Sequence, residues 1–154
     1  MVEHKELEGL CVIYESKKGP RLIPVIANVD DRGFLWQLFE GDNIKRTYIV
    51  GNFEKDTIRG FHMHKKESKW FFVPRGAIKI VTVDSSSNDI QTFVLSDKQP
   101  AVLYIPPGYA NGWKALEEQS LLVGMSDKTL EESKGDDYRS DPMEYGDVWS
   151  VKAR

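Results

Sequence analysis

The chain has 154 residues, a formal net charge of −3, three histidines and a single cysteine. This length is typical of one domain, and a hydrophobic content of 40% is enough for one core, which excludes a wholly disordered chain. The acidic balance disfavours a nucleic-acid-binding protein, and one cysteine excludes an intrachain disulfide or a cysteine-based zinc site. We therefore expect a single domain over residues 1–154 with no nucleic-acid partner.

The sequence shows neither a secretory signal nor a membrane span. Its first residues are charged, with Glu3, Lys5 and Glu6, and no apolar core with a small-residue cleavage site follows them. No apolar run approaches the roughly 20 residues that a helix needs to cross a bilayer. We expect a cytoplasmic protein with no membrane partner.

Short β-branched and aromatic runs, separated by turn residues, predict about ten strands. In chain order these are Leu10–Tyr14, Leu22–Val29, Phe34–Phe39, Arg46–Val50, Thr57–His64, Trp70–Val73, Ala77–Val83, Ile90–Leu95, Val102–Ile105 and Ser120–Met125. Only Lys128–Gly135 has a helix-like composition, and the polar stretch from Asp136 is expected to drape over the strands. So many short strands predict an all-β protein, either a closed barrel or a jelly roll.

The sharpest local pattern is Arg59-Gly60-Phe61-His62-Met63-His64. Side chains of a strand alternate between its two faces, so His62 and His64 point to one face while Arg59, unless a bulge intervenes, points to the other. Three roles for the histidine pair stay open: metal ligands, a general base, or hydrogen-bonding groups in a binding site.

Metal binding would require further ligands near the pair. In metal-binding cupins, which this arrangement resembles, His-x-His precedes a Glu and a later His. Here Glu67 comes one residue early and Asn111 stands at the fourth position, and an amide is a poor ligand for transition metals. We expect no metal, and because the chain has no glycine-rich nucleotide motif we expect no nicotinamide or ATP cofactor.

General base catalysis fits the pair better. Imidazole titrates near neutral pH, so His62 is suited to removing a proton from a carbon next to a carbonyl. The resulting enolate needs a stabilising cation, for which Lys69, Arg59 and Arg46 are candidates.

Four motifs in order resemble the dTDP-4-dehydrorhamnose 3,5-epimerase family: Asp31–Phe34, Arg59–His62, Leu103–Gly112, and Asp141-Pro142 followed by Trp149. The resemblance implies a cupin-type jelly roll that forms a homodimer. It also implies a dTDP-linked 4-keto-6-deoxyhexose as the substrate, whose carbons C3 and/or C5 are epimerised without a metal. Ile44–Tyr48 and Arg59–Lys65 are similar to the related sugar 3,4-ketoisomerases, so ketoisomerisation stays an alternative, as does a binding protein without activity.

The resemblance also implies roles for single residues. His62 matches the base, Lys69 the lysine beside the oxyanion, and His64 and Tyr48 match proton-handling residues of the ketoisomerases. Arg59 resembles an arginine that binds the diphosphate, and Arg32 one that contacts the nucleotide from its own or from a partner subunit. The expected substrate-binding residues are Arg32, Arg46, Arg59, Asn111, Trp113 and Tyr138, the last two as aromatic rings at the mouth of the barrel.

Three residues of the epimerases have no counterpart in this sequence. Asn111 replaces a histidine, no tyrosine occurs near Lys128-Thr129, and the epimerase aspartate that orients the histidine lies close to a longer C-terminus. The acid that returns the proton is therefore open between Tyr48, Tyr138 and His64.

Overall fold

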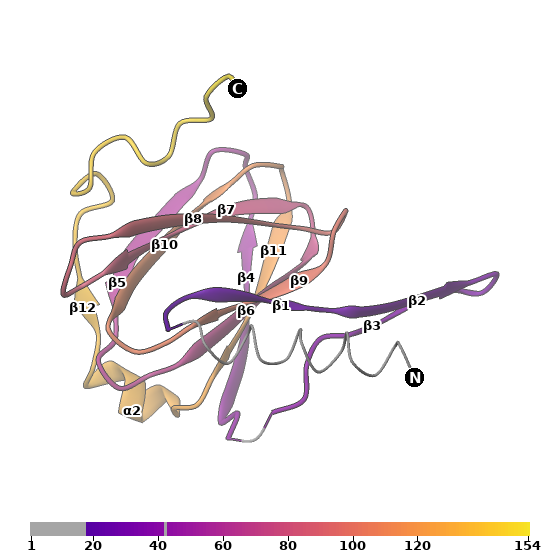
Figure 1. The fold of residues 1–154 in the computed structure, drawn as a ribbon, viewed down its shortest axis with the longest axis horizontal. Helices are drawn as coiled ribbons and strands as arrows, with labels where there is room; N and C mark the ends of the chain where they lie inside the picture. The colour runs from indigo at the N-terminus through magenta and orange to yellow at the C-terminus, as the bar shows by residue number, and fades with distance from the viewer. Residues whose placement is uncertain (1–17, 42) are drawn as a thin grey trace.

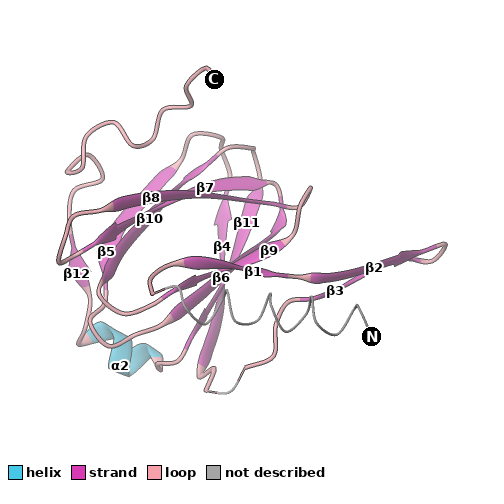
Figure 2. Cartoon of the chain, viewed as in Figure 1, coloured by secondary structure: helices cyan, strands magenta, loops and turns pink. Residues whose placement is uncertain are grey.

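Residues 18–41 and 43–154 are described in the computed structural model (Figure 1). They form twelve β-strands and one short helix (Figure 2). Almost all of the regular structure in these ranges is therefore β-sheet. The elements are β1 (Arg21–Pro24), β2 (Ile26–Asp30), β3 (Gly33–Gln37), β4 (Arg46–Asn52), β5 (Ile58–Met63), β6 (Lys69–Arg75), β7 (Ala77–Asp84), β8 (Ile90–Ser96), β9 (Ala101–Ile105), β10 (Tyr109–Ala115), β11 (Ser120–Ser126), α2 (Leu130–Lys134) and β12 (Tyr138–Arg139). The strand expected over Leu10–Tyr14 lies outside the described residues.

Two five-stranded antiparallel sheets form the body of the fold. One has the order β1-β9-β6-β11-β4 and the other β12-β5-β10-β7-β8. The hairpin β2–β3 forms a separate two-stranded sheet that projects away from them (Figure 1). This arrangement confirms the predicted all-β jelly roll, and the one helix among the described residues lies inside the segment of helix-like composition.

Two strand predictions need correction. The run Leu22–Val29 is divided between β1 and β2, because Pro24 cannot donate a ladder hydrogen bond and the chain leaves the first sheet there. Strand β10 is absent from the predicted strands, and it begins directly after the turn residues Pro106-Pro107-Gly108. It is nonetheless a central strand, paired with β5 on one side and with β7 on the other.

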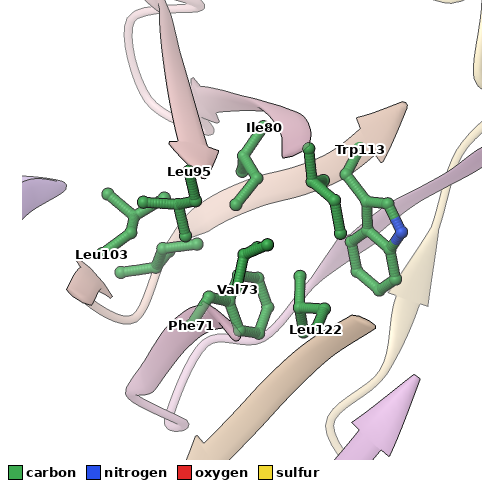
Figure 3. Packing of buried hydrophobic residues seen from close by; sticks show 9 residues of the cluster. Phe71, Val73, Ile80, Leu95, Leu103, Trp113 and Leu122 are labelled. Carbon is green, nitrogen blue, oxygen red and sulfur yellow. The ribbon is translucent and has the colours of Figure 1, made fainter. Parts of the chain in front are cut away.

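The main core lies where the two sheets face each other. Figure 3 shows it as a cluster of inward-pointing side chains: Phe71, Val73, Ile78, Ile80, Leu95, Leu103, Ile105, Trp113 and Leu122. The expectation that Trp113 lies at the barrel mouth is wrong, because alternation along β10 turns its ring inward. The ring meets Phe71 edge-on, with 5.8 Å between the ring centroids.

The segment after β11 closes over one edge of the second sheet, as expected. Helix α2 begins with a capping box between Thr129 and Glu132. Strand β12 then pairs with β5, and further on Trp149 packs against Phe61 with 5.3 Å between ring centroids. Within the described ranges, no helix is long and apolar enough to cross a membrane.

Candidate active site

A cavity of about 540 Å³ opens at the C-terminal end of β5, where His62 lies in the strand and His64 directly follows it. Its wall combines β4, β5, β6, α2 and the segment that follows α2. The lining residues are Arg46, Thr47, Tyr48, His62, His64, Lys69, Leu130, Ser133, Lys134, Asp137 and Arg139. The structure thus brings together the four residues expected to be catalytic: His62, Lys69, His64 and Tyr48.

His62 is oriented by a carboxylate. Its Nδ1 lies 3.1 Å from Oδ1 of Asp137, whose other oxygen accepts a 2.9 Å hydrogen bond from Nε of Arg139. Burial raises the pKa of Asp137, but the hydrogen bonds from His62 and Arg139 outweigh it and hold that pKa below its usual value. Asp137 is therefore an anion at neutral pH that places the proton of His62 on Nδ1 and leaves a lone pair on Nε2.

Hydrogen bonds on both sides of β5 hold this dyad in place. On one side β12 pairs with β5, with Arg139 opposite His62. On the other side, Nδ2 of Asn111 donates to the backbone carbonyl of His62 over 3.1 Å. Asp136 accepts the backbone N–H groups of Lys65 and Lys66, at 3.0 and 2.8 Å, and so fixes the chain just before Asp137.

Sequence reasoning missed Asp137. The family resemblance places the orienting aspartate close to a longer C-terminus, whereas Asp137 lies just after the short helix α2. The available signal was the pair of consecutive aspartates, Asp136 and Asp137, at the start of a segment already expected to cover the barrel.

Lys69 is the buried cation of the cavity. It begins β6 and is 7% exposed. Burial lowers the pKa of Lys69 to about 8, an effect that the nearby charges of Glu67 and Asp137 oppose. At pH 7 the side chain is still mostly an ammonium, in a setting where a positive charge is weakly solvated.

His64 lies deeper than His62 and is 5% exposed. Its Nε2 is 3.4 Å from Oε2 of Glu67, 3.5 Å from Oγ of Ser133 and 3.7 Å from Oδ1 of Asp137. Burial and the charge of Lys69 lower the pKa of His64, despite the opposing effect of the carboxylates. The imidazole is therefore neutral at neutral pH.

Glu67 is fully buried and engaged on both oxygens. One oxygen accepts from Arg46 at 2.9 Å and from Ser126 at 2.7 Å, and the other accepts from Ser133 at 2.8 Å. Burial raises the pKa of Glu67, but these serine hydrogen bonds and nearby positive charge keep it below its usual value. Among the described residues, no group of three or more His, Cys, Asp or Glu side chains is arranged to hold a metal ion.

Tyr48 completes the wall from β4. Alternation along β4 turns Arg46 and Tyr48 to the same face, and the Arg46 guanidinium lies 5.4 Å from the centre of the Tyr48 ring. Gly124 stands opposite Tyr48 on β11, where an added Cβ would come within 2.3 Å of the ring. Burial raises the pKa of Tyr48 to about 12, so its hydroxyl keeps its proton.

Five of the six expected substrate-binding residues lie outside the described wall of this cavity: Arg32, Arg59, Asn111, Trp113 and Tyr138. Arg59 donates to the side chain of Asn52 at 3.2 Å. The expectation that Arg59 and His62 point to opposite faces of β5 is wrong, because a register shift places them opposite Trp113 and Asn111, which share one face of β10. Arg32 pairs with Asp30 in the turn of the β2–β3 hairpin. The sixth residue, Arg46, lines the cavity.

Tyr138 is half-exposed and stacks with Lys65, whose Nζ is 4.6 Å from the ring centre. Its neighbours on both sides in the chain, Asp137 and Arg139, face the cavity instead. Lys134 and Arg139 add cationic groups to the wall that sequence reasoning did not select.

Comparisons with known proteins agree with this architecture. The dTDP-4-dehydrorhamnose 3,5-epimerase from Sulfolobus tokodaii is 27% identical, and the match covers 89% of this chain and 84% of that chain with a TM-score of 0.76. A mutant of the 3,4-ketoisomerase QdtA from Thermoanaerobacterium thermosaccharolyticum, in complex with TDP-4-keto-6-deoxyglucose, is 25% identical, with 80% and 89% of the two chains covered and a TM-score of 0.69.

A curated relative comes from Bacillus subtilis (strain 168). Its spore coat polysaccharide biosynthesis protein SpsL is 26% identical over 114 residues, which are 68% of this chain and 76% of that protein. The sequence model of the family described as dTDP-4-dehydrorhamnose 3,5-epimerase matches residues 18–151, nearly the whole of the described fold and its cavity. With its jelly roll, its histidine–aspartate pair and this match, the chain belongs to the dTDP-4-dehydrorhamnose 3,5-epimerase family of sugar epimerases and isomerases.

Proposed function

We propose that the protein isomerises a dTDP-linked 4-keto-6-deoxyhexose by moving a proton on a carbon next to the ketone. One observation carries the proposal: His62, held by Asp137 at 3.1 Å, shares a cavity wall with the buried cation Lys69. A base and an electrophilic partner are the two groups that proton abstraction next to a carbonyl requires. The family match and the relatives that act on such sugars support the choice of substrate.

In the proposed reaction, Nε2 of His62 takes the proton from the carbon. The electron pair of that C–H bond forms the enolate double bond, and the negative charge moves to the ketone oxygen, where Lys69 stabilises it. Asp137 stabilises the imidazolium that His62 becomes, as a carboxylate does for a catalytic histidine. No metal takes part in the proposed sequence.

The product depends on where the proton returns. Delivery to the opposite face of C3 and/or C5 gives an epimer, and Tyr48, whose hydroxyl keeps its proton, is the proposed donor. A 3,4-ketoisomerase is the second candidate, favoured by His64 and Tyr48, which both line the same cavity as His62. In that reaction the proton returns to the former ketone carbon.

We also propose that the active form is a homodimer in which the β2–β3 hairpin docks on a second copy. Large apolar side chains of this hairpin are exposed, with Val29 at 79% and Phe34 at 65%. Such a patch is unfavourable in water unless it is covered. The hairpin would then carry Arg32 toward the cavity of the partner subunit.

Deuterium exchange tests the proposed chemistry. The protein would be incubated with TDP-4-keto-6-deoxyglucose in deuterium oxide, and the label located by NMR. Label at C3 or C5 with inversion indicates an epimerase, and a 3-keto product indicates the ketoisomerase. No label in the sugar after prolonged incubation would contradict both and support a binding protein.

A further inference from the structure

His64 has two nitrogens in very different surroundings. Nδ1 is buried and has no hydrogen-bond partner among the described residues, although the side chain lines the cavity. Nε2, by contrast, lies within 3.7 Å of oxygens of Glu67, Ser133 and Asp137. A neutral imidazole carries one proton, so these oxygens decide which nitrogen holds it.

The directions of the hydrogen bonds around Glu67 determine which ring nitrogen of His64 holds the proton. The guanidinium of Arg46 can only donate, and it occupies Oε1 together with Ser126. Ser133 donates its proton to Oε2, so its oxygen presents lone pairs to His64. The atoms that face Nε2 are therefore acceptors, and they stabilise a proton on Nε2.

We propose that Glu67 is a positioning residue that holds His64 in the Nε2–H tautomer, so that Nδ1 offers a lone pair to a substrate hydroxyl beside the ketone. The inference rests on the proposed function, whose substrates carry a hydroxyl on the carbon next to the ketone. Glu67 does not line the cavity, so it acts only through His64.

The proposed role connects to the chemistry through that hydroxyl. When His62 removes the carbon-bound proton, the new enolate has a hydroxyl on the adjacent carbon. A hydrogen bond from this hydroxyl to Nδ1 of His64 orients the sugar so that the C–H bond faces His62. For a ketoisomerase, Nδ1 of His64 also takes the hydroxyl proton and passes it to the former ketone oxygen. The electron pair of the O–H bond forms the new carbonyl, and the pair of the enolate double bond takes the proton of the His62 imidazolium at the former ketone carbon.

Charged groups from three segments face His64. Glu67 comes from the β5–β6 loop, Lys69 from β6, and Asp136 and Asp137 from the segment after α2. Only Glu67 among the carboxylates is fully buried. Three hydrogen bonds fix the orientation of the Glu67 carboxylate. A single substitution can therefore replace the acceptor that faces Nε2 of His64 by a donor in the same place.

Glu67→Gln performs this reversal with almost no change in shape. Arg46 requires the amide oxygen on its side, which turns the amide NH2 toward Ser133 and Nε2 of His64. Nε2 then becomes an acceptor and the proton moves to Nδ1. In ¹⁵N NMR of the full chain at pH 8, we expect the two His64 ring nitrogens to exchange their protonated and unprotonated chemical shifts.

The kinetic counterpart uses the exchange assay. We expect Glu67→Gln to lower kcat for deuterium incorporation about 10- to 100-fold, the range of a misplaced acid–base group, with KM within about twofold. Ser126→Ala is the matched control, because it removes a hydrogen bond from the same carboxylate without reversing its polarity. It should keep the Nε2–H tautomer.

Each outcome decides the proposal. An unchanged tautomer in Glu67→Gln, or the same tautomer change in Ser126→Ala, would overturn it. A changed tautomer with unchanged kcat would refute the role of Nδ1 toward substrate. If the wild-type protein shows no exchange while the tautomer still responds to Glu67→Gln, the proposed function fails and the assignment of Glu67 stands.

Discussion

The side chains around the cavity and those of the β2–β3 hairpin differ in burial and in whether they have partners within the chain. At the cavity, Asp137 in the wall and the buried Glu67 behind it are paired with donors of the same chain. The hairpin exposes large apolar side chains such as Val29 and Phe34, and places Arg32 at its tip with 86% of its side chain exposed. The residues of the proposed proton chemistry therefore all lie in the cavity wall of one chain, whereas the hairpin leaves large apolar side chains uncovered.

The largest effect on the reaction rate is expected from substitution of the proposed base in the cavity. His62→Ala removes the proposed base, and we expect the rate of deuterium incorporation to fall by about 10³-fold or more, within the range for general bases. The measurement is label content by NMR, with circular dichroism and Tm to verify that the variant folds. Retention of more than a tenth of the rate would show that another group is the base.

Asp137→Asn sharpens the role of the carboxylate. Asn can accept the hydrogen bond from His62 but carries no charge to stabilise the imidazolium, so we expect kcat to fall about 10²-fold. Asp141→Asn is the control, since it removes a nearby charge that accepts only from the backbone of Met143. Equal losses in both variants would argue for a general charge effect instead.

The pH dependence tests Lys69. Because burial lowers the pKa of Lys69 to about 8, the rate should fall as pH rises above 8, where the ammonium that stabilises the enolate is lost. Stability should change in the opposite direction. The unfolded chain binds the Lys69 proton up to its ordinary pKa near 10.5, so unfolding is disfavoured as pH rises from 8 to 10.5.

Lys69→Met isolates both trends. The Tm difference between wild type and this variant should shift in favour of wild type between pH 8 and 10, and the rate should lose its decline above pH 8. A parallel Tm response in the two proteins would place the pKa of Lys69 near its ordinary value.

Breaking the hairpin should have a smaller effect on turnover. Phe34→Glu places a charge in the exposed apolar patch, and we expect it to shift the protein from dimer to monomer in analytical ultracentrifugation. Arg32→Ala should keep the dimer and raise KM about tenfold, which corresponds to about 1.4 kcal/mol of lost binding.

Ile90→Glu, on β8, is a control for the effect of adding a charge to an exposed apolar side chain. A monomeric Phe34→Glu protein with wild-type KM would show that the cavity needs nothing from a second copy.

Trp113→Phe should have the smallest effect. The Trp113 ring packs in the core and not at the mouth, so the substitution should lower the free energy of unfolding by about 1–3 kcal/mol. KM should be unchanged. An increase in KM without loss of stability would restore the sequence-based view of this ring as a stacking surface.

Local sequence patterns were enough to predict most of the strands and the histidine pair. Alternation with a period of two is local, so β-branched runs such as Ala77–Val83 predicted β7 and also placed His62 and His64 on one face. The motifs that resemble the family likewise lie within short stretches of chain. Local patterns of this kind predict the folded structure well because they determine to which face of a strand each side chain points.

Which residues meet in the cavity depends on how the strands are arranged in space. Asp137 reaches His62 across 75 residues of sequence, through the pairing of β12 with β5. Arg59 instead donates to Asn52, and Trp113 packs in the core between the sheets. Such contacts depend on strand order and on which face of each strand is covered, and neither is encoded in the residues adjacent to the site.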